Sequence, residues 1–502
     1  MELILNKKKT KILLVYPNQM LQNLIPVNIS LLSACLKKDG FNVEVFDTTF
    51  YKTEEESGDE VRVRNLQIRP FDLSEYGIKV KNANVFEDFR KMVHHYKPDI
   101  IGYTITDDTF PLAYKLMHST RDYNGLTVAG GAFPTFAPEK AISYPLINAI
   151  CVGEGEEALV ELAQAVEDKS DYTHIKNLWV KKDGRTIKNP LRAPVNLDSL
   201  PEVDLAIWEK ERFFRPMQGK VYKMAPIYTD RGCPYQCTYC CASSYSNMYS
   251  KAKLGNYCRF RSIRNAIKEI RGLIKKYSVE YIYFSAETFL LLRNDLFDEL
   301  IREYKKIGLP FWFQSRPENV THEKIKRLKA IGADRVSIGL ESGNEHYRRT
   351  KLKRDFSNAD AIRYFDIIAE EGLKSSVNNI IGFPDESREM IFDTINLNRQ
   401  LKTDSISVFY FTPYHGTFLR DYCIQKGYLE NENKPADRRK DTNLKMPQIL
   451  STELKGLMRT FPMYVRFEKE LYPFIQRAEK MDKEGNEEFN RLSEIFRERF
   501  FN

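Results

Sequence analysis

Three cysteines near the middle of the chain could hold a metal centre. Cys233, Cys237 and Cys240 follow a short apolar segment at C-x3-C-x2-C spacing, and only Cys241 and Cys258 lie near enough in sequence to add a fourth thiol. Iron–sulfur clusters are normally held by four cysteine thiolates, so a cluster with three protein ligands keeps one iron free to bind another molecule. The spacing favours a cluster with one open coordination position.

Two other interpretations of these thiols stay open. A structural zinc site is usually closed by four ligands in two pairs, and no second pair follows Cys240. Inert buried cysteines are the other alternative, although half of the eight cysteines lie within residues 233–241. This clustering is typical of a reducing compartment rather than of a disulfide framework, so we expect a cytoplasmic protein.

Composition indicates a globular protein of two or three domains. The chain has 502 residues, 42% of them apolar, and its 77 Lys and Arg against 69 Asp and Glu give a net charge of +8. This small excess does not predict nucleic-acid binding. Lysines interrupt the apolar residues at the amino terminus, and no apolar run reaches the length of a membrane span, so we expect no signal peptide and no transmembrane segment.

Strands and helices alternate in residues 1–165. This alternation predicts a parallel, doubly wound, Rossmann-like sheet whose ligands lie beyond the carboxyl ends of the strands. A polar insertion at residues 51–82 interrupts the pattern and is typical of a loop. We expect strands at 11–16, 42–47, 99–105, 126–129 and 149–152, with Pro17, Thr104, Thr106, Gly130, Gly131 and Gly153 at their carboxyl ends.

A second run of β/α units fills residues 225–430, after a connection at 166–224. Six repeats predict a partial (β/α)6 barrel, in which chemistry gathers at the carboxyl ends of the strands. Residues 431–502 have a helical pattern rich in aromatics, which is typical of core packing, and we expect them to form a cap over the open side of the barrel. The expected strands are 226–229, 280–285, 310–314, 334–340, 375–381 and 405–411.

The strand ends of this barrel carry polar side chains that could do chemistry. Glu287 could bind a ligand or cap a helix, and Arg316 could bind an anion or form a structural ion pair. Tyr414 and His415 could transfer protons near neutral pH, or they could be a substrate contact or a solvated pair. Ser337 lies in the fourth strand and Glu341 follows it, and an acid buried there would need a partner.

The cysteine spacing, with Tyr239 before the last thiol, resembles the signature of the radical S-adenosylmethionine (SAM) superfamily. The resemblance implies a [4Fe–4S] cluster on the three cysteines, with SAM on the open iron and a 5′-deoxyadenosyl radical as product. Glu287 matches the acid of the family's Gly-Gly-Glu motif, although Ser285-Ala286 replaces the glycines. The SAM-binding positions that the resemblance implies are Tyr239, Glu287, Ser337, Glu341 and the backbone of Ile381.

The amino-terminal half resembles the cobalamin (B12) binding domain that precedes the barrel in many radical SAM proteins. The likeness rests on Gly-Gly-Ala-Phe-Pro-Thr at 130–135 and Gly-Glu-Gly-Glu at 153–156. It implies cobalamin near Thr104, Thr106, Gly130, Gly131 and Gly153. A D-x-H-x-x-G motif is absent and His94, His95 and His118 lie in expected helices, so we expect no axial histidine. A nucleotide-type or purely structural Rossmann-like domain is the alternative.

Together the resemblances imply a cobalamin-dependent radical SAM methyltransferase. Such an enzyme methylates an unactivated carbon of a small-molecule, lipid or natural-product substrate through a 5′-deoxyadenosyl radical and methylcobalamin, with electrons from flavodoxin or ferredoxin. Ring contraction, cyclisation or another non-methylating rearrangement is the enzymatic alternative. A methylthiotransferase would need a cysteine-rich site near the amino terminus, where only Cys35 and Cys151 occur. A zinc- or nucleic-acid-binding protein would use the basic residues Arg259, Arg261, Arg264 and Lys268.

Overall fold

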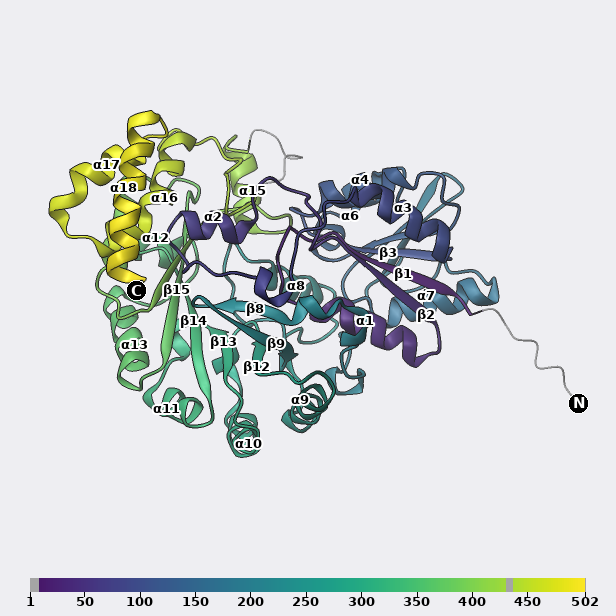
Figure 1. Cartoon of the computed structure of the whole chain (residues 1–502). Helices are drawn as coiled ribbons and strands as arrows, with labels where there is room; N and C mark the ends of the chain where they lie inside the picture. Colours follow the sequence, from purple (N-terminus) through teal and green to yellow (C-terminus); the bar gives the residue numbers. More distant parts are fainter. Residues whose placement is uncertain (1–8, 430–436, 502) are drawn as a thin grey trace, which may run out of the picture. The chain divides into compact units, whose positions relative to one another are not determined.

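The computed structural model describes residues 9–429 and 437–501, which form two compact units (Figure 1). The units alternate along the chain. The first holds residues 9–55, 78–212 and 245–259, and the second holds residues 56–77, 213–244, 260–429 and 437–501. The expected start of the cap, at residue 431, lies outside the described residues.

The first unit contains the predicted doubly wound sheet. Its strand order is β2-β1-β3-β4-β5-β6-β7, and the first five strands are parallel, as expected from their alternation with helices. Strands β6 and β7 are antiparallel and come from the segment expected to be a connection. The strands are β1 (Lys11–Tyr16), β2 (Asn42–Asp47), β3 (Ile100–Thr104), β4 (Leu126–Gly130), β5 (Ala149–Cys151), β6 (Leu178–Lys182) and β7 (Arg185–Lys188).

Helices cover both faces of this sheet, as Figure 1 shows. On one face, Phe89 of α3 and Leu116 of α4 pack with Leu13, Val15 and Ile101 of the strands. On the other face α1 packs against α7. The helices of this unit are α1 (Val27–Lys38), α3 (Val85–Tyr96), α4 (Phe110–Ser119), α5 (Ala132–Phe136), α6 (Pro138–Ser143) and α7 (Glu156–Asp168).

A buried arginine fixes the loop that follows β1. The Arg212 side chain is 1% exposed and donates hydrogen bonds to the carbonyls of Gln22 (2.7 Å) and Leu24 (2.9 Å). It also forms an ion pair with Asp47 (3.3 Å), at the end of β2. The guanidinium therefore neutralises a buried acid and satisfies two loop carbonyls that have no sheet partner.

The second unit is built on the predicted six parallel strands. Its sheet order is β16-β15-β14-β13-β12-β9-β8, in which only β8 is antiparallel to its neighbour. The partial barrel expected from the β/α repeats is confirmed. Its strands are β8 (Phe214–Met217), β9 (Lys220–Tyr228), β12 (Tyr281–Ser285), β13 (Phe311–Ser315), β14 (Ala333–Glu341), β15 (Lys374–Ile381) and β16 (Ser405–Tyr410).

Helices between the strands cover the outer face of this sheet (Figure 1). They are amphipathic, and their buried residues, such as Ile267 and Ile270 of α9, recur at helical spacing. The helices of this unit that follow the strands are α9 (Ile263–Tyr277), α10 (Asn294–Tyr304), α11 (His322–Ala330), α12 (Glu345–Thr350), α13 (Asn358–Glu370), α14 (Arg388–Asn398) and α15 (Phe418–Gln425). Helix α8 (Cys241–Lys251) begins in this unit and continues into the first.

Residues 56–77 join the barrel unit, although they interrupt the first domain in the sequence. The expectation of a loop is wrong here, because the segment contains helix α2 (Gly58–Arg64). Ser57 and Glu60 form a capping box that starts this helix. Farther on, Gln67 Oε1 accepts a hydrogen bond from Val408 N (3.1 Å) at the edge strand β16. The ring of Tyr76 lies 5.2 Å from that of Phe214 in β8, so the segment contacts both edges of the open sheet.

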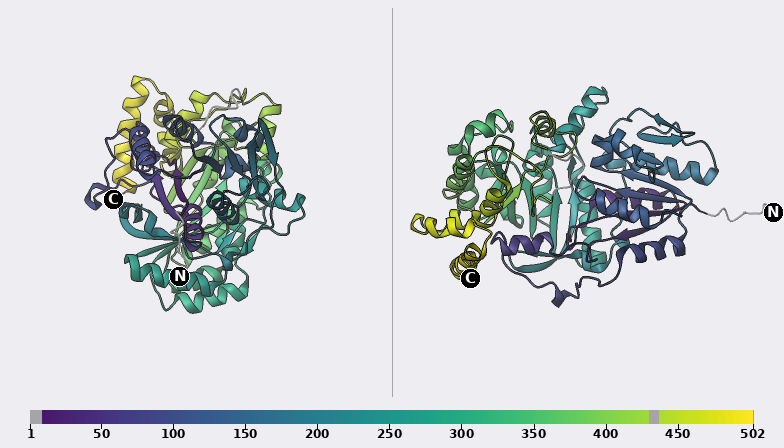
Figure 2. Two further views of the ribbon diagram at one scale, coloured as in Figure 1. Left: turned by 90° about the vertical axis from the view of Figure 1, so that its right-hand side faces the viewer. Right: turned by 90° about the horizontal axis from the view of Figure 1, so that it is seen from above.

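The carboxyl-terminal helices pack on one another and on the barrel. The views in Figure 2 show α16 (Ser451–Arg466), α17 (Tyr472–Glu479) and α18 (Lys483–Phe500) as one group. Helix α16 packs against β16 and α14, and its Leu457 and Phe461 are fully buried. The aromatic pattern is therefore core packing, as expected. Within the described residues, no helix combines the length and apolar character needed to cross a membrane.

Candidate active site

The three-cysteine loop follows β9 at the carboxyl edge of the barrel, where the sequence predicts it. Neighbouring loops of the barrel unit hold it in place. The Thr238 hydroxyl donates to the carbonyl of Lys351 (2.7 Å), and the Thr238 carbonyl accepts from the N–H of Leu419 (3.1 Å). Helix α8 begins at Cys241, directly after the last of the three thiols. The loop is thus anchored by the segments that follow β14 and β16.

Two arginines approach the central cysteine. Arg316 Nη1 lies 2.8 Å from Cys237 Sγ, and Arg354 Nη1 lies 4.0 Å from the same sulfur, which is buried. Arg316 also pairs with Glu318 and stacks over the ring of Tyr235 at 3.7 Å. Cationic donors stabilise a thiolate or an anionic cluster sulfur but would be poor partners for a neutral thiol. The environment of Cys237 therefore fits a sulfur ligand of a cluster.

The other two thiols lie in a less polar setting. Cys233 Sγ is 3.8 Å from Thr288 Oγ1. Burial raises the pKa of the Cys233 thiol, and it raises the pKa of Cys240 to about 12. Such thiols ionise when a metal centre binds them, because the metal compensates for the lost hydration. In the described part of the chain, no three His, Cys, Asp or Glu side chains are grouped closely enough to hold a single metal ion.

Arg354 connects the cysteine loop to the end of β14. Besides Cys237, it donates to Tyr239 Oη (3.2 Å) and to the carbonyl of Gly339, and it lies 3.8 Å from Glu341 Oε1. Burial raises the pKa of Glu341, while the Arg354 charge opposes that effect. The backbone of Glu341 has a φ of 71°, which residues other than glycine rarely adopt. A Cβ at Gly339 would collide with the Glu341 carboxylate. The sequence did not point to Arg354, which belongs to the basic run Lys351–Arg354.

The structure brings only part of the predicted SAM set together. Tyr239 and Glu341 meet at Arg354, beside Cys237. Glu287 follows β12 and is accessible to solvent although protein surrounds it on most sides, which raises the pKa of its carboxyl. Ser337, by contrast, is buried and hydrogen-bonded to Trp312 (2.8 Å) and Ser376 (2.7 Å).

Two further predicted positions lie at the same edge of the barrel. The carbonyl of Ile381, the last residue of β15, accepts from Phe411 N (2.8 Å) and so has a protein partner. Tyr414 and His415 lie half-buried in the loop after β16, where the Tyr414 carbonyl accepts from the Thr417 hydroxyl (2.7 Å). The next residue, Gly416, accepts from Ser244 Oγ (2.7 Å). The roles of Ile381, Tyr414 and His415 in catalysis stay predictions.

The predicted cobalamin positions line the carboxyl edge of the first sheet. Thr104 of β3 is in register with Gly130 of β4. Gly131 has a φ of 105° and packs so closely on Ile105 that a side chain would not fit there. The Thr106 hydroxyl donates to Asp108 and caps this loop. Thr104, Thr106, Gly130, Gly131 and Gly153 are all partly exposed, which fits a ligand-binding edge.

The candidate histidines lie elsewhere in this unit. His94 and His95 are exposed near the end of α3, which leads into the start of β3. His118 is exposed near the end of α4, with its ring against Tyr114. These three imidazoles therefore do not lie at the carboxyl edge, in agreement with the expectation that none of them is an axial ligand.

Gly153 is packed against a group of stacked tyrosines that follows the cysteine loop in sequence. Gly153 has a φ of 89°, and a Cβ there would lie 2.7 Å from Tyr249 Oη. The rings of Tyr245 and Tyr249 both stack on the ring of Tyr257, with centroid distances of 5.2 and 4.8 Å. Residues 245–259 therefore complete the cobalamin-type unit, although they come directly after the barrel's first loop.

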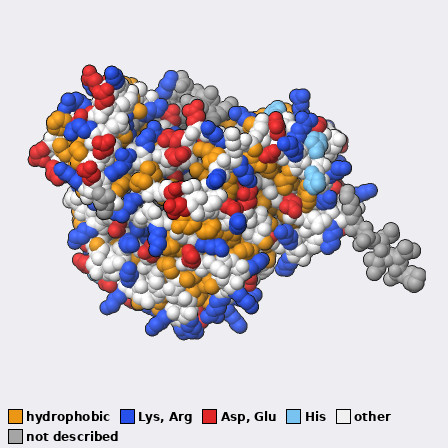
Figure 3. Space-filling model, in the orientation of Figure 1, with side chains coloured by type: hydrophobic (Ala, Val, Ile, Leu, Met, Phe, Trp, Pro, Cys, Tyr) orange, Lys and Arg blue, Asp and Glu red, His pale blue; other side chains and the backbone are white. Residues whose placement is uncertain are grey.

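Two of the four basic residues at 259–268 are held in ion pairs within the protein. Arg259 pairs with Glu154, and Arg261 is 2% exposed and pairs with the buried Glu269. On the face shown in Figure 3, acidic and basic side chains are interspersed. The ion pairs favour structural roles for Arg259 and Arg261 over contacts with a polyanion.

Comparison with protein families agrees with both halves of the chain. The B12 binding domain profile matches residues 18–163, and the radical SAM superfamily profile matches residues 227–397. An uncharacterized methyltransferase of Pyrococcus horikoshii is 28% identical over 380 residues, which cover 74% of this chain and 80% of the relative. The cytidylyl-2-hydroxyethylphosphonate methyltransferase of Streptomyces wedmorensis is 21% identical, with 81% and 79% covered.

Solved structures share the fold. The radical SAM methyltransferase TsrM from Kitasatospora setae superimposes with a TM-score of 0.66 at 16% identity, over 97% of this chain and 99% of that one. The cobalamin-dependent radical SAM enzyme OxsB gives a TM-score of 0.62 at 16% identity, over 98% of this chain and 71% of that one. Since the two family profiles together span more than half of the chain and the fold agrees with both, the protein belongs to the radical SAM superfamily and carries a B12-binding domain ahead of its barrel.

Proposed function

We propose that the protein is a cobalamin-dependent radical SAM enzyme that methylates an unactivated carbon of a small molecule. The observation that carries the proposal is the placement of the Cys233–Cys240 loop at the carboxyl edge of a parallel barrel, in a chain that also has a B12-binding domain. The carboxyl edge is where barrel enzymes gather their chemistry.

The cofactors are assigned to the residues that fit them. Cys233, Cys237 and Cys240 would hold a [4Fe–4S] cluster. When bound, the cluster and SAM supply a 5′-deoxyadenosyl radical and cobalamin supplies a transferable methyl group, while the protein provides position and electrostatics. SAM would contact Tyr239, Glu287, Ser337, Glu341 and the backbone at Ile381. Cobalamin would rest on Thr104, Thr106, Gly130, Gly131 and Gly153.

The protein's own groups have definable tasks in this scheme. Arg316 and Arg354 direct positive charge at Cys237 and so stabilise negative charge on its sulfur. Arg354 also holds Tyr239 and Glu341 in one orientation, which prepares a carboxylate for the ammonium group of a bound amino acid. Tyr414 and His415, at the last strand end, are candidates for moving a proton at the substrate.

The substrate is assigned by class. One similar protein is named for a nucleotide-linked phosphonate, and TsrM has been solved with tryptophan as substrate. We propose a small organic molecule for this chain as well, with lipids and natural products included. Electrons would come from an external flavodoxin or ferredoxin in the cytoplasm, because the clustered free cysteines suit a reducing compartment.

Metal and corrin analysis of one preparation tests this proposal. After anaerobic reconstitution with iron, sulfide and hydroxocobalamin, we expect one [4Fe–4S] cluster per chain and corrin absorbance that survives desalting. Incubation with SAM and a reductant should release 5′-deoxyadenosine. About one zinc per chain with no iron would overturn the cluster assignment. Loss of all corrin on desalting would overturn the cobalamin assignment.

Comparison of small molecules from cells with and without the gene then tests the reaction type. A product heavier than its precursor by one CH2 group is the expected result. A product isomeric with its precursor would contradict methylation and point to a rearrangement.

A further inference from the structure

A cavity of about 190 Å³ lies at the opposite end of the barrel from the cysteines. It is lined by residues that precede or begin β16, such as Asp404 and Ser405, and by Gln218 in the turn before β9. The parallel strands run from this end toward the cysteine loop. Strand β16, whose first residues line the cavity, has six residues, so the two ends are separated by about 20 Å at a rise of about 3.3 Å per residue. The cavity is therefore not part of the catalytic edge.

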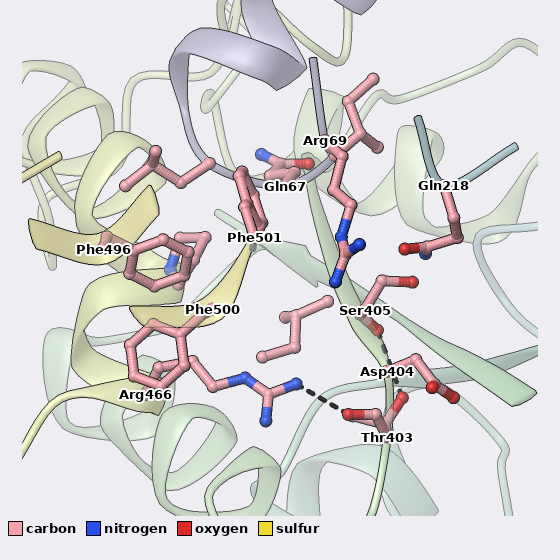
Figure 4. A pocket seen from close by; sticks show the side chains of 14 residues that line it. Gln67, Arg69, Gln218, Thr403, Asp404, Ser405, Arg466, Phe496, Phe500 and Phe501 are labelled. Atoms are coloured by element: carbon pink, nitrogen blue, oxygen red, sulfur yellow. Dashed lines mark hydrogen bonds between the residues drawn. The ribbon is translucent and has the colours of Figure 1, made fainter. Parts of the chain in front are cut away.

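Two guanidinium groups extend into this cavity (Figure 4). Arg466 Nη2 donates to the carbonyl of Thr403 (2.7 Å), and burial lowers the pKa of Arg466, although the nearby charge of Asp404 opposes this shift. Arg69 makes no hydrogen bond or ion pair with any residue that the structure describes. Asp404 is the one acid among the lining residues, and its Oδ2 already accepts from the N–H of Ser375 (2.7 Å). The described lining thus carries an excess of positive charge.

The opposite wall is aromatic. Phe496, Phe500 and Phe501 come from α18 and the residue after it, and Figure 4 shows their rings together on one side of the cavity. The rings of Phe496 and Phe500 are 4.9 Å apart, and those of Phe496 and Phe501 are 5.5 Å apart. A wall of packed rings offers an apolar surface on which a flat group can rest.

The framework of the cavity is held by hydrogen bonds that do not involve Arg69. The side-chain oxygen of Gln67 accepts a hydrogen bond from Val408 N (3.1 Å), and its amide nitrogen lies 3.7 Å from Met458 Sδ. Gln67 therefore fixes the segment before Arg69 against the edge strand β16. A guanidinium on a fixed segment loses little conformational entropy when it binds an anion.

We infer that this cavity is a second ligand site, which binds a small organic carboxylate. The carboxylate oxygens would meet Arg69 and Arg466, and the flat apolar body would rest on Phe500 and Phe501. At about 190 Å³ the cavity is smaller than the roughly 300–1,000 Å³ of pockets for drug-sized ligands, so we expect a small ligand. Nothing in this assignment depends on the cluster or on cobalamin.

Titration of the full-length, cofactor-loaded protein with benzoate tests the inference. We expect saturable binding of one benzoate per chain and a rise of the unfolding temperature with benzoate concentration, since a ligand of the folded state stabilises it. Benzamide has the same shape without the charge and should bind at least tenfold more weakly. Equal binding of benzamide, or no saturation by benzoate, would overturn the inference without any variant being needed.

Variants then locate the site. Arg69→Gln should weaken benzoate binding at least tenfold, whereas Arg69→Lys should retain part of it, because Lys keeps the charge but not the planar fork. Arg327→Gln removes a half-buried arginine of α11 that is not among the residues lining the cavity, and this control should bind as the unaltered protein does. Unchanged affinity in Arg69→Gln would overturn the site assignment.

Two further measurements distinguish this inference from the proposed enzymatic function and from a site for simple anions. Cys237→Ala, which should lose the cluster, should still bind benzoate, so failure of the proposed enzymatic function would leave this result intact. Inorganic phosphate at equal concentration should compete only weakly, because it lacks the apolar body. If phosphate displaces bound benzoate as effectively as additional benzoate does, the aromatic wall has no role in binding. The organic-acid assignment would then be wrong.

Discussion

Arg316 Nη1 lies 2.8 Å from Cys237 Sγ, while the same guanidinium pairs with Glu318 and stacks on Tyr235. Each contact fixes the orientation of the fork, so the donor is directed at the sulfur before any cluster binds. Hydrogen bonds and charges near cluster sulfurs set the reduction potential.

Arg316→Gln should therefore make the cluster harder to reduce. A cation beside the ligand sulfur stabilises the added electron, so its loss should move the potential to more negative values, and Arg316→Lys should give an intermediate value. Redox titration of the reconstituted protein, followed by electron paramagnetic resonance, measures this. Arg327→Gln serves as control, and an unchanged potential in Arg316→Gln would contradict the assigned role.

Single Ala substitutions of the cysteines should separate ligands from bystanders. Cys233→Ala, Cys237→Ala and Cys240→Ala should each lose most of the cluster iron, because three ligands leave none to spare. Cys241→Ala and Cys258→Ala should keep it. Iron and sulfide content after anaerobic reconstitution gives the answer, and a cluster-free Cys258→Ala would show that the ligand set is wider than proposed.

The carboxyl of Glu386 should make the protein less stable as pH rises. Burial raises the pKa of Glu386 from 4.5 to about 8, although the N–H groups of Gly382 and Phe383 oppose this by donating to its Oε2. Between these values the unfolded chain releases a proton that the folded protein retains, so the free energy of unfolding falls with pH, by up to about 1.4 kcal/mol per pH unit.

Glu386→Gln removes this titration. Its free energy of unfolding, relative to that of the unaltered protein, should therefore rise between pH 5 and pH 8. Urea unfolding at several pH values measures the difference, in which all other titrating groups cancel. A difference that stays constant over this range would mean that Glu386 ionises normally.

Arg212 should be among the most sensitive positions of the first unit. Arg212→Ala leaves Asp47 buried without its cation and removes the donor to the Leu24 carbonyl, which should cost about 3–5 kcal/mol. Arg90→Ala removes an exposed pair with Asp122 (3.4 Å) and should change stability by no more than about 0.5 kcal/mol. Denaturant unfolding compares the two variants. Equal losses of unfolding free energy would show that the buried Arg212 pair contributes no more to stability than the exposed Arg90 pair.

Gly153→Ala should disturb the cobalamin edge more than a glycine replacement elsewhere. Both Gly153 and Gly184 have positive φ, so Ala costs about 1–2 kcal/mol of backbone strain at each. A Cβ at Gly184 meets no atom within 4 Å, whereas at Gly153 it meets Tyr249 Oη at 2.7 Å. Only Gly153→Ala should lose corrin binding, measured by absorbance after desalting. Adding Tyr249→Phe to the Gly153→Ala variant should restore part of the corrin binding, because it removes the oxygen with which the Cβ collides.

Periodicity predicted the parts of the fold that follow local rules. Six barrel strands and five parallel strands of the first sheet appear where apolar runs and strand-ending glycines place them. Helix α2 was missed because the charge of residues 51–82 outweighed one local signal, the Ser57–Glu60 capping box that the sequence does contain.

The candidate site was predictable only to the extent that its residues belong to motifs. The cysteines and Glu341 could be found from spacing and strand ends. Arg354 could not, because a basic residue in the charge-rich stretch Lys351-Leu352-Lys353-Arg354 normally lies in solvent. Its burial depends on the segment after α12 returning over the cysteine loop, a contact between residues 117 positions apart. Ser337 was expected to contact SAM; its hydrogen bonds to Trp312 and Ser376 could not be foreseen from the sequence, and its role stays a prediction.

The interleaving of the two units has a consequence for how the chain is made. On the ribosome, the first unit cannot be completed when residue 212 emerges, because it still lacks residues 245–259, and residues 56–77 must wait for a barrel that is synthesised later. Domains usually fold in order during synthesis. Here the amino-terminal half must remain incomplete until the cysteine loop has also been translated, so neither half can be cut out at a single peptide bond and still be whole.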